Sequence, residues 1–247
     1  MFFLIPAIGL YTIGLGVVSV ASAIVSGTGA FAHRCARLWS WLILATTGVK
    51  VSVAGVQRVP AEGAYLFICN HQSIYDIPII FANLPFDLRI IAKESLGRFP
   101  FIGAHLRRTG HVLVDRTTPG TTTFRQVSRL LSNGQSLLVF PEGTRSADGR
   151  LGRFRGGIFL LAISAGFPIV PMAVRGSRHV MKKNRLMTCP GEVALQVFDP
   201  IPTAGLTRED AKALAQRVRE VVAAGVAGDE DADRQPTTDT RQPTTGD

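Results

Sequence analysis

The stretch YLFICNHQSIYD, residues 65–76, decides the fold. Its first five residues are apolar or aromatic and predict a short buried β-strand over residues 65–69. A polar segment with one histidine and one aspartate follows directly, and a helix is expected over residues 74–83. A buried strand that opens through a polar turn into a helix is the unit from which α/β domains are built.

The chain on either side repeats this alternation. Short apolar runs bounded by turn residues predict further strands at residues 88–92, 111–115, 136–140, 168–174 and 193–198. Helical spacing of apolar residues predicts helices at residues 121–132, 156–165 and 208–224. We therefore expect an α/β fold with a mostly parallel or mixed sheet, in one domain over residues 51–227. The tail, residues 228–247, is almost free of apolar side chains and is expected to be disordered.

The first 50 residues have a different character and are predicted to form a membrane-associated helical segment. Residues 2–32 contain no charged side chain, a run longer than a bilayer-spanning helix needs. The run lacks a preceding basic residue and is too long for a signal peptide. Residues 33–44 add two Arg and two Trp, which favours a helix at the membrane interface, with a helix buried in the core as the alternative. Whether the anchor spans the bilayer or forms a monotopic hairpin stays open.

The charge distribution indicates an anionic partner. The chain carries +9 at pH 7, but residues 229–247 hold six acidic and two basic side chains, which leaves +13 on the other 228 residues. A lipid surface, a phosphorylated substrate or a nucleic acid would each suit such a body. The basic residues are scattered and no aromatic stacking platform is evident, so nucleic acid is not expected. Basic residues after the apolar run, Arg34, Arg37 and Lys50, place the body on the cytoplasmic side of the cell membrane.

Two segments carry candidate chemistry. In the first, His71 could act as a general base that Asp76 orients, provided that His71 lies in the strand-to-helix turn and Asp76 points back from the first helical turn. On a continuous helix, residues five apart would not face each other. The second segment, FPEGTRS at residues 140–146, follows another apolar strand. Its Arg145, Thr144 and Gly143 are suited to bind an anion, because arginine grips phosphate bidentately and glycine lets the backbone approach closely.

The order of these segments resembles the glycerolipid acyltransferase family, specifically its 1-acylglycerol-3-phosphate acyltransferases. The matching features are His71-x4-Asp76, the block 110–116 that ends in Asp-Arg, the block 140–146, and the Pro-containing apolar strand at residues 169–174. The resemblance covers residues 51–198. It implies an acyltransferase domain that uses acyl-CoA or acyl-carrier protein as donor, with no cofactor and no metal.

The resemblance also implies roles for individual residues. His71 would deprotonate the sn-2 hydroxyl of lysophosphatidic acid and Asp76 would stabilise the imidazolium, giving phosphatidic acid by direct transfer. Arg116 and Arg145, with Lys93 as a third candidate, would bind the acceptor's phosphate unless they are surface or ion-paired bases. Glu142 would contact the acceptor's glycerol or hydrogen-bond within its own loop. Gly143 would serve the turn.

Three alternatives stay open. A covalent acyl-Ser73 intermediate would replace direct transfer, although Ser73 is only two residues from His71. The acceptor could instead be glycerol 3-phosphate, a lyso-ornithine lipid or another lysophospholipid. A basic membrane-binding protein without activity would explain the charge and the apolar segment, but not the joint occurrence of His71, Asp76, Glu142 and Arg145.

Overall fold

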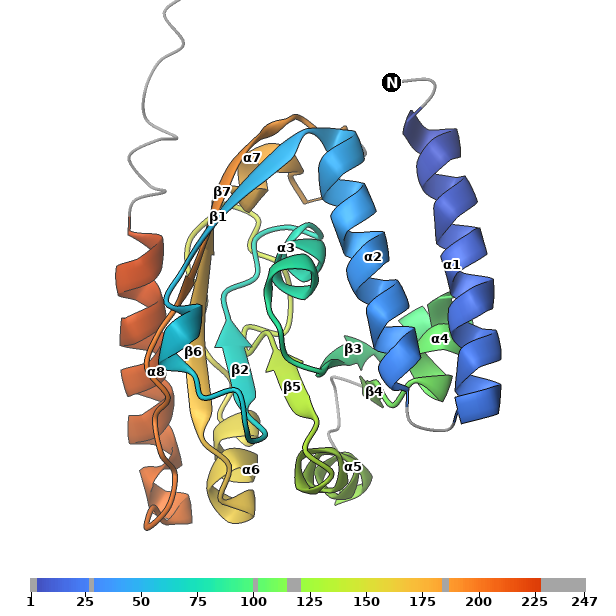
Figure 1. The fold of residues 1–247 in the computed structure, drawn as a ribbon. Helices are drawn as coiled ribbons and strands as arrows, with labels where there is room; N and C mark the ends of the chain where they lie inside the picture. The colour runs from blue at the N-terminus through green and yellow to red at the C-terminus, as the bar shows by residue number, and fades with distance from the viewer. Residues whose placement is uncertain (1–3, 27–28, 100–101, 115–120, 184–186, 228–247) are drawn as a thin grey trace, which may run out of the picture.

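The computed structural model describes residues 4–26, 29–99, 102–114, 121–183 and 187–227 (Figure 1). The helices are α1 Leu4–Ser26, α2 Ala30–Thr47, α3 Asp76–Asn83, α4 Ile102–Arg108, α5 Thr121–Ser132, α6 Gly157–Ala165, α7 Ser177–Val180 and α8 Ala211–Val226. The strands are β1 Val49–Ala54, β2 Leu66–Cys69, β3 Leu88–Lys93, β4 Val112–Val114, β5 Ser136–Val139, β6 Ile169–Arg175 and β7 Gly191–Val197. The predicted tail, residues 228–247, lies outside the described residues.

The strands form one seven-stranded sheet in the order β1-β7-β6-β2-β5-β3-β4. All neighbouring pairs are parallel except β6 and β7, which are antiparallel. The prediction of an α/β fold with a mostly parallel or mixed sheet is therefore confirmed. β1 was not predicted, because it is an edge strand with mostly exposed side chains and lacks the continuous apolar run of the central strands.

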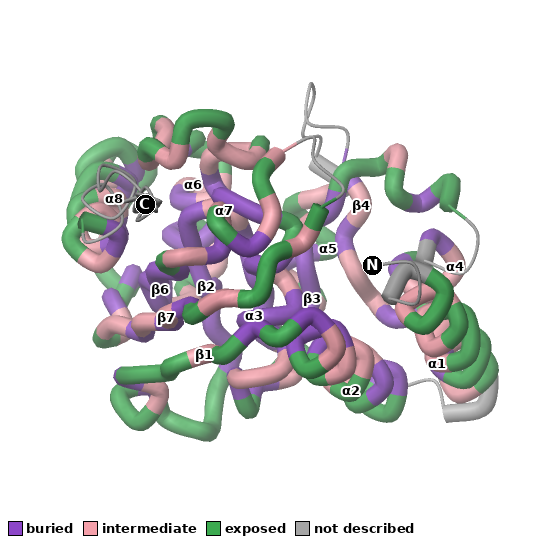
Figure 2. Tube along the Cα trace, turned by 90° about the horizontal axis from the view of Figure 1, so that it is seen from above, coloured by how far each residue is buried: buried purple, intermediate pink, exposed green. Residues whose placement is uncertain are grey.

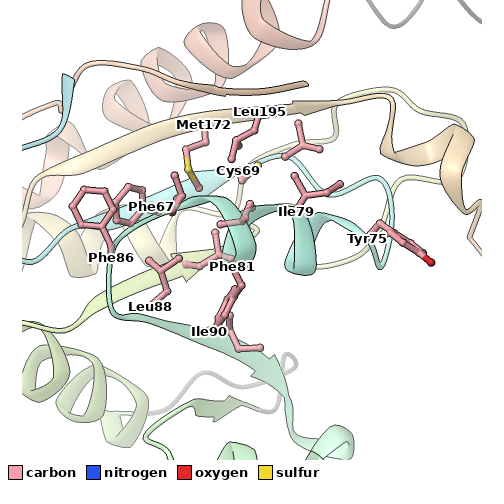
Figure 3. Close-up of a cluster of buried hydrophobic side chains, with 14 of the residues drawn as sticks. Phe67, Cys69, Tyr75, Ile79, Phe81, Phe86, Leu88, Ile90, Met172 and Leu195 are labelled. Atoms are coloured by element: carbon pink, nitrogen blue, oxygen red, sulfur yellow. The ribbon is translucent and has the colours of Figure 1, made fainter. Parts of the chain in front are cut away.

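Helices cover both faces of the sheet, and β2 shows how its sequence serves two cores. Phe67 and Cys69 point to the face covered by α2 and α3, where aromatic and aliphatic side chains gather (Figure 3). Leu66 and Ile68 point to the opposite face, which α5, α6 and α8 cover. All four side chains are fully buried, which is why this strand reads as an uninterrupted apolar run.

The two N-terminal helices lie side by side at one end of the molecule (Figure 1). α2 packs against α3, whereas α1 lies outside it and touches α2 and α4. Seen from above, α1 is exposed or half-buried along almost its whole described length (Figure 2). Within the part of the chain that the structure describes, no helix combines the length and the apolar character needed to cross a membrane.

Candidate active site

The candidate site lies at the carboxyl ends of the parallel strands. β2, β5, β3 and β6 run parallel to one another, so their carboxyl ends lie on the same side. His71 follows β2, the segment 140–146 follows β5, Lys93 ends β3, and α7 follows β6. The carboxyl edge of a parallel sheet is the usual place for ligands in α/β proteins. The fold thus brings together segments that lie about 20 to 110 residues from His71 in the sequence.

His71 and Asp76 meet in the way that their spacing requires. His71 lies in the turn after β2, and Asp76 is the first residue of α3. The distance between His71 Nδ1 and Asp76 Oδ2 is 2.8 Å. The same oxygen accepts hydrogen bonds from the backbone N–H groups of Gln72 (2.8 Å) and Ser73 (2.9 Å). Because the fully buried carboxylate is fixed by the backbone, it holds the Nδ1–H tautomer of His71 and leaves Nε2 as the basic nitrogen.

Phe140 stacks on the imidazole from the neighbouring strand end. The ring centroids of His71 and Phe140 are 4.0 Å apart and the ring planes are inclined by 17°. The side chain of His71 is 12% exposed, so the ring is enclosed but accessible at its edge. Stacking and the bond to Asp76 together restrict both rotation and tilt of the ring.

Glu142 joins the two candidate loops through its carboxylate. Oε1 accepts a hydrogen bond from the backbone N–H of His71, and Oε2 accepts one from Gly152, each at 2.8 Å. Burial raises the pKa of Glu142, and these two backbone hydrogen bonds oppose the rise. Both oxygens are thus used within the loops, as in the loop hydrogen-bonding alternative considered for this residue. Its contact with a substrate stays a prediction.

The loop after Glu142 borders a basic pocket of about 890 Å³. Gly143 has φ +76°, and a Cβ at this position would come within 2.8 Å of the Arg155 guanidinium. The positive φ of the turn therefore favours glycine, and a side chain at this position would also require the Arg155 guanidinium to shift. Thr144 is exposed and Arg145 is half-buried. Both line the pocket, whose other charged residues are Glu142, Asp148, Arg150, Arg153, Arg155 and Lys183.

Ser73 is oriented away from a nucleophilic role. Its hydroxyl donates a hydrogen bond to the Met181 carbonyl at 2.8 Å and accepts one from the backbone N–H of Tyr75 at 3.3 Å. The residue is fully buried. Asn70, one residue before His71, pairs its side-chain amide with both backbone groups of Val174 at 2.8 Å and so fixes the end of β2 to β6.

The remaining predicted residues are placed less closely. Lys93 is exposed at the carboxyl end of β3, on the same edge as His71. Arg116 lies outside the described residues. Among the residues that the structure does describe, no three His, Cys, Asp or Glu side chains are grouped so that they could hold a metal ion. Sequence reasoning missed Lys183, because it belongs to none of the recognisable blocks.

Comparisons with known proteins agree with the family resemblance seen in the sequence. Residues 50–175 match the Acyltransferase family. The human 1-acyl-sn-glycerol-3-phosphate acyltransferase alpha is 32% identical over 208 residues, which are 83% of this chain and 74% of that protein. The 1-acyl-sn-glycerol-3-phosphate acyltransferase of Cocos nucifera is 31% identical over 176 residues, and this chain spans 55% of its length. The crystal structure of the 1-acyl-sn-glycerophosphate (LPA) acyltransferase PlsC from Thermotoga maritima superimposes with a TM-score of 0.74 at 26% identity, covering 94% of this chain and 97% of that one.

Proposed function

Because the chain belongs to the acyltransferase family, we propose that it transfers an acyl chain from an acyl thioester to the sn-2 hydroxyl of lysophosphatidic acid, giving phosphatidic acid. The observation that carries the proposal is the His71–Asp76 pair, hydrogen-bonded at 2.8 Å on the carboxyl edge of the sheet. The acceptor follows from the names of the similar proteins, which refer to 1-acyl-glycerol-3-phosphate or LPA.

The reaction proceeds by direct transfer between two bound substrates. Nε2 of His71 takes the proton of the acceptor hydroxyl as its oxygen attacks the thioester carbonyl carbon. The imidazolium that forms is stabilised by Asp76. The tetrahedral intermediate then expels the thiolate, which takes a proton from His71, and the C–S bond is replaced by a C–O ester bond. The hydrogen bonds of Ser73 to Met181 and Tyr75 support this route over an acyl-Ser73 intermediate.

The basic pocket beside Glu142 binds the phosphate of the acceptor. Arg145 lines it, and Thr144 supplies a hydroxyl there. Arg116 and Lys93 are further candidates for this phosphate. Cationic donors at a fixed distance from His71 would hold the acceptor's phosphate so that its sn-2 hydroxyl lies beside the base. The donor is acyl-CoA or acyl-carrier protein, and the mechanism uses no cofactor and no metal.

The α1–α2 pair attaches the enzyme to the membrane. Its outer surface exposes large apolar side chains, with Leu10 77% and Trp41 58% exposed. Such side chains are suited to the interfacial region, where tryptophan is enriched. Arg34 and Arg37 on α2 favour the cytoplasmic face of the cell membrane.

Sedimentation with anionic lipid vesicles tests this attachment. A Leu10→Ser/Trp41→Ser variant should bind them less than the wild type. Val53→Ser, which removes an exposed apolar side chain from β1, serves as the matched control. Equal binding by all three proteins would contradict the attachment through α1 and α2.

The activity is tested with the full chain purified in detergent, labelled acyl-CoA and lysophosphatidic acid. His71→Ala should lower kcat by about 10²- to 10⁴-fold, the usual contribution of a general base. Arg145→Ala should raise the acceptor KM, whereas Arg208→Ala, exposed at the start of the C-terminal helical region, should not. Full activity of a folded His71→Ala would refute the mechanism. If the wild type is silent, acyl-carrier protein replaces the donor, and silence there would refute lysophosphatidic acid as acceptor.

A further inference from the structure

Lys183 reaches the predicted phosphate loop from a distant part of the sequence. It follows α7, yet its ammonium donates hydrogen bonds to the backbone carbonyl of Arg145 (2.8 Å) and to the hydroxyl of Thr144 (3.4 Å). The side chain is half-buried and lines the same pocket as those two residues. A single cation thus contacts two successive residues of the loop that follows β5.

The backbone that carries Lys183 is itself fixed to the first catalytic loop. Val180 is buried, and its carbonyl accepts a hydrogen bond from the N–H of Cys189 at 2.8 Å. The next carbonyl, that of Met181, accepts the hydroxyl of Ser73, two residues from the catalytic base. The segment 180–183 therefore joins the loop of His71 to the loop of Arg145.

The charges in the pocket indicate that it is suited to an anion. Five cationic side chains line it (Arg145, Arg150, Arg153, Arg155 and Lys183) against two acidic ones, Glu142 and Asp148. Cations gathered around one pocket repel each other, and a bound anion would relieve that repulsion. By binding the carbonyl of Arg145, the ammonium holds the backbone of that residue while its guanidinium stays available to the pocket.

We infer that Lys183 is a positioning residue: it fixes the Thr144–Arg145 segment so that Arg145 can bind the phosphate of the acceptor. The inference rests on the proposed function, because it assigns the pocket to a phosphate-bearing acceptor. Lys183 acts on the acceptor through Arg145 and has no role in binding the acyl donor. Its loss therefore weakens acceptor binding while the base and its carboxylate stay in place.

The test is acyl transfer by the full chain with lysophosphatidic acid and a labelled acyl-CoA. Lys183→Met should raise the acceptor KM by about tenfold, the effect of losing one hydrogen bond from a charged donor. The donor KM should stay unchanged and kcat should change less than about threefold. Lys182→Met, which removes the neighbouring exposed ammonium, is the matched control and should leave all three constants unchanged. Lys183→Arg keeps charge and donors and should restore most of the acceptor affinity.

A double-mutant cycle separates positioning from direct binding. If Lys183 acts through Arg145, Lys183→Met should add less than about twofold to the acceptor KM of Arg145→Ala. The inference is overturned if the two effects multiply, if the donor KM rises instead, or if Lys183→Met behaves like Lys182→Met. If Lys183→Met does not fold, Lys183→Gln takes its place in the cycle. A wild type that is silent with both acyl-CoA and acyl-carrier protein would refute the proposed function, whereas an active wild type with an unaffected Lys183→Met refutes only this inference.

Discussion

Replacing Asp76 by asparagine tests what its carboxylate contributes beyond a hydrogen bond. Oδ2 accepts three hydrogen bonds, from the ring Nδ1–H of His71 and from the backbone N–H groups of Gln72 and Ser73. The other oxygen, Oδ1, is buried and has no hydrogen-bond partner among the described residues. An amide oxygen can therefore take the place of Oδ2 and keep all three hydrogen bonds, with its NH2 group at the position of Oδ1. The tautomer of His71 is then preserved, and only the negative charge is lost.

The size of the effect follows from the geometry. Two unit charges 2.8 Å apart attract each other by about 1.5 kcal/mol in water and by about 6 kcal/mol at an effective dielectric constant of about 20. Because the His71 side chain is 12% exposed and that of Asp76 is fully buried, the relevant value lies between these limits. A loss of about 3 to 4 kcal/mol when the imidazolium forms corresponds to about 10²- to 10³-fold in kcat. The three bonds to the remaining oxygen stay paired, but the new NH2 group lies where Oδ1 has no partner, so its unpaired donors should lower the free energy of unfolding by about 1 to 3 kcal/mol.

Asp76→Ala should behave differently and serves as the comparison. It leaves the buried backbone N–H groups of Gln72 and Ser73 without their acceptor, which costs about 1 to 3 kcal/mol for each. It should be clearly less stable than Asp76→Asn in chemical unfolding and less active in acyl transfer. The reasoning is refuted if Asp76→Asn loses far more than about 10³-fold in kcat, or if it retains the kcat of the wild type.

Three further predictions concern stability and the second loop. Glu142→Gln keeps only one of two acceptor oxygens and should lower the free energy of unfolding by about 1 to 3 kcal/mol, measured by denaturant titration. Gly143→Ala introduces a Cβ at φ +76° against Arg155 and should lower activity and the melting temperature together; an unchanged protein would show that the turn tolerates a side chain. Burial lowers the pKa of His33 and His105 to about 4 each, so the unfolded chain binds protons near pH 6.5 while the native protein does not. Stability should therefore fall as the pH is lowered from about 6.5 to 4, by up to about 1.4 kcal/mol per pH unit for each histidine, and His105→Gln should reduce that slope.

Much of the fold could be predicted because buried strands and turn residues leave a local pattern. β2 is apolar at every position, since both of its faces are covered, and the polar turn with His71 marks its end. The same local rules indicated the turn at Gly143. β1 gave no such signal, because an edge strand with exposed side chains depends on pairing with β7 and not on its own composition.

The parts of the site that escaped prediction depend on long-range pairing. Glu142 meets the backbone of His71 only because β2 and β5 are neighbours in the sheet, and no local rule gives that order. Lys183 lies beside the loop because β6 and α7, which precede it, end at this side of the sheet. The residues around it in the sequence look like any exposed basic segment. Both contacts are made to a backbone group. Every residue has such groups, so the sequence does not indicate which one a side chain will bind.

The connections between the loops explain how the proposed general base and the proposed phosphate site could act as one unit. The carbonyl of His71 accepts a hydrogen bond from the N–H of Ser146 at 2.8 Å, and its own N–H is bound to Glu142 at the same distance. Gln72 adds a third connection to the carbonyl of Gly149. A shift of the loop at residues 142–149 would break these bonds, so the protein itself fixes the position of the proposed phosphate site relative to His71. Effective positioning of this kind reduces the entropy lost in the transition state, and a small displacement of either loop should cost more in rate than in stability.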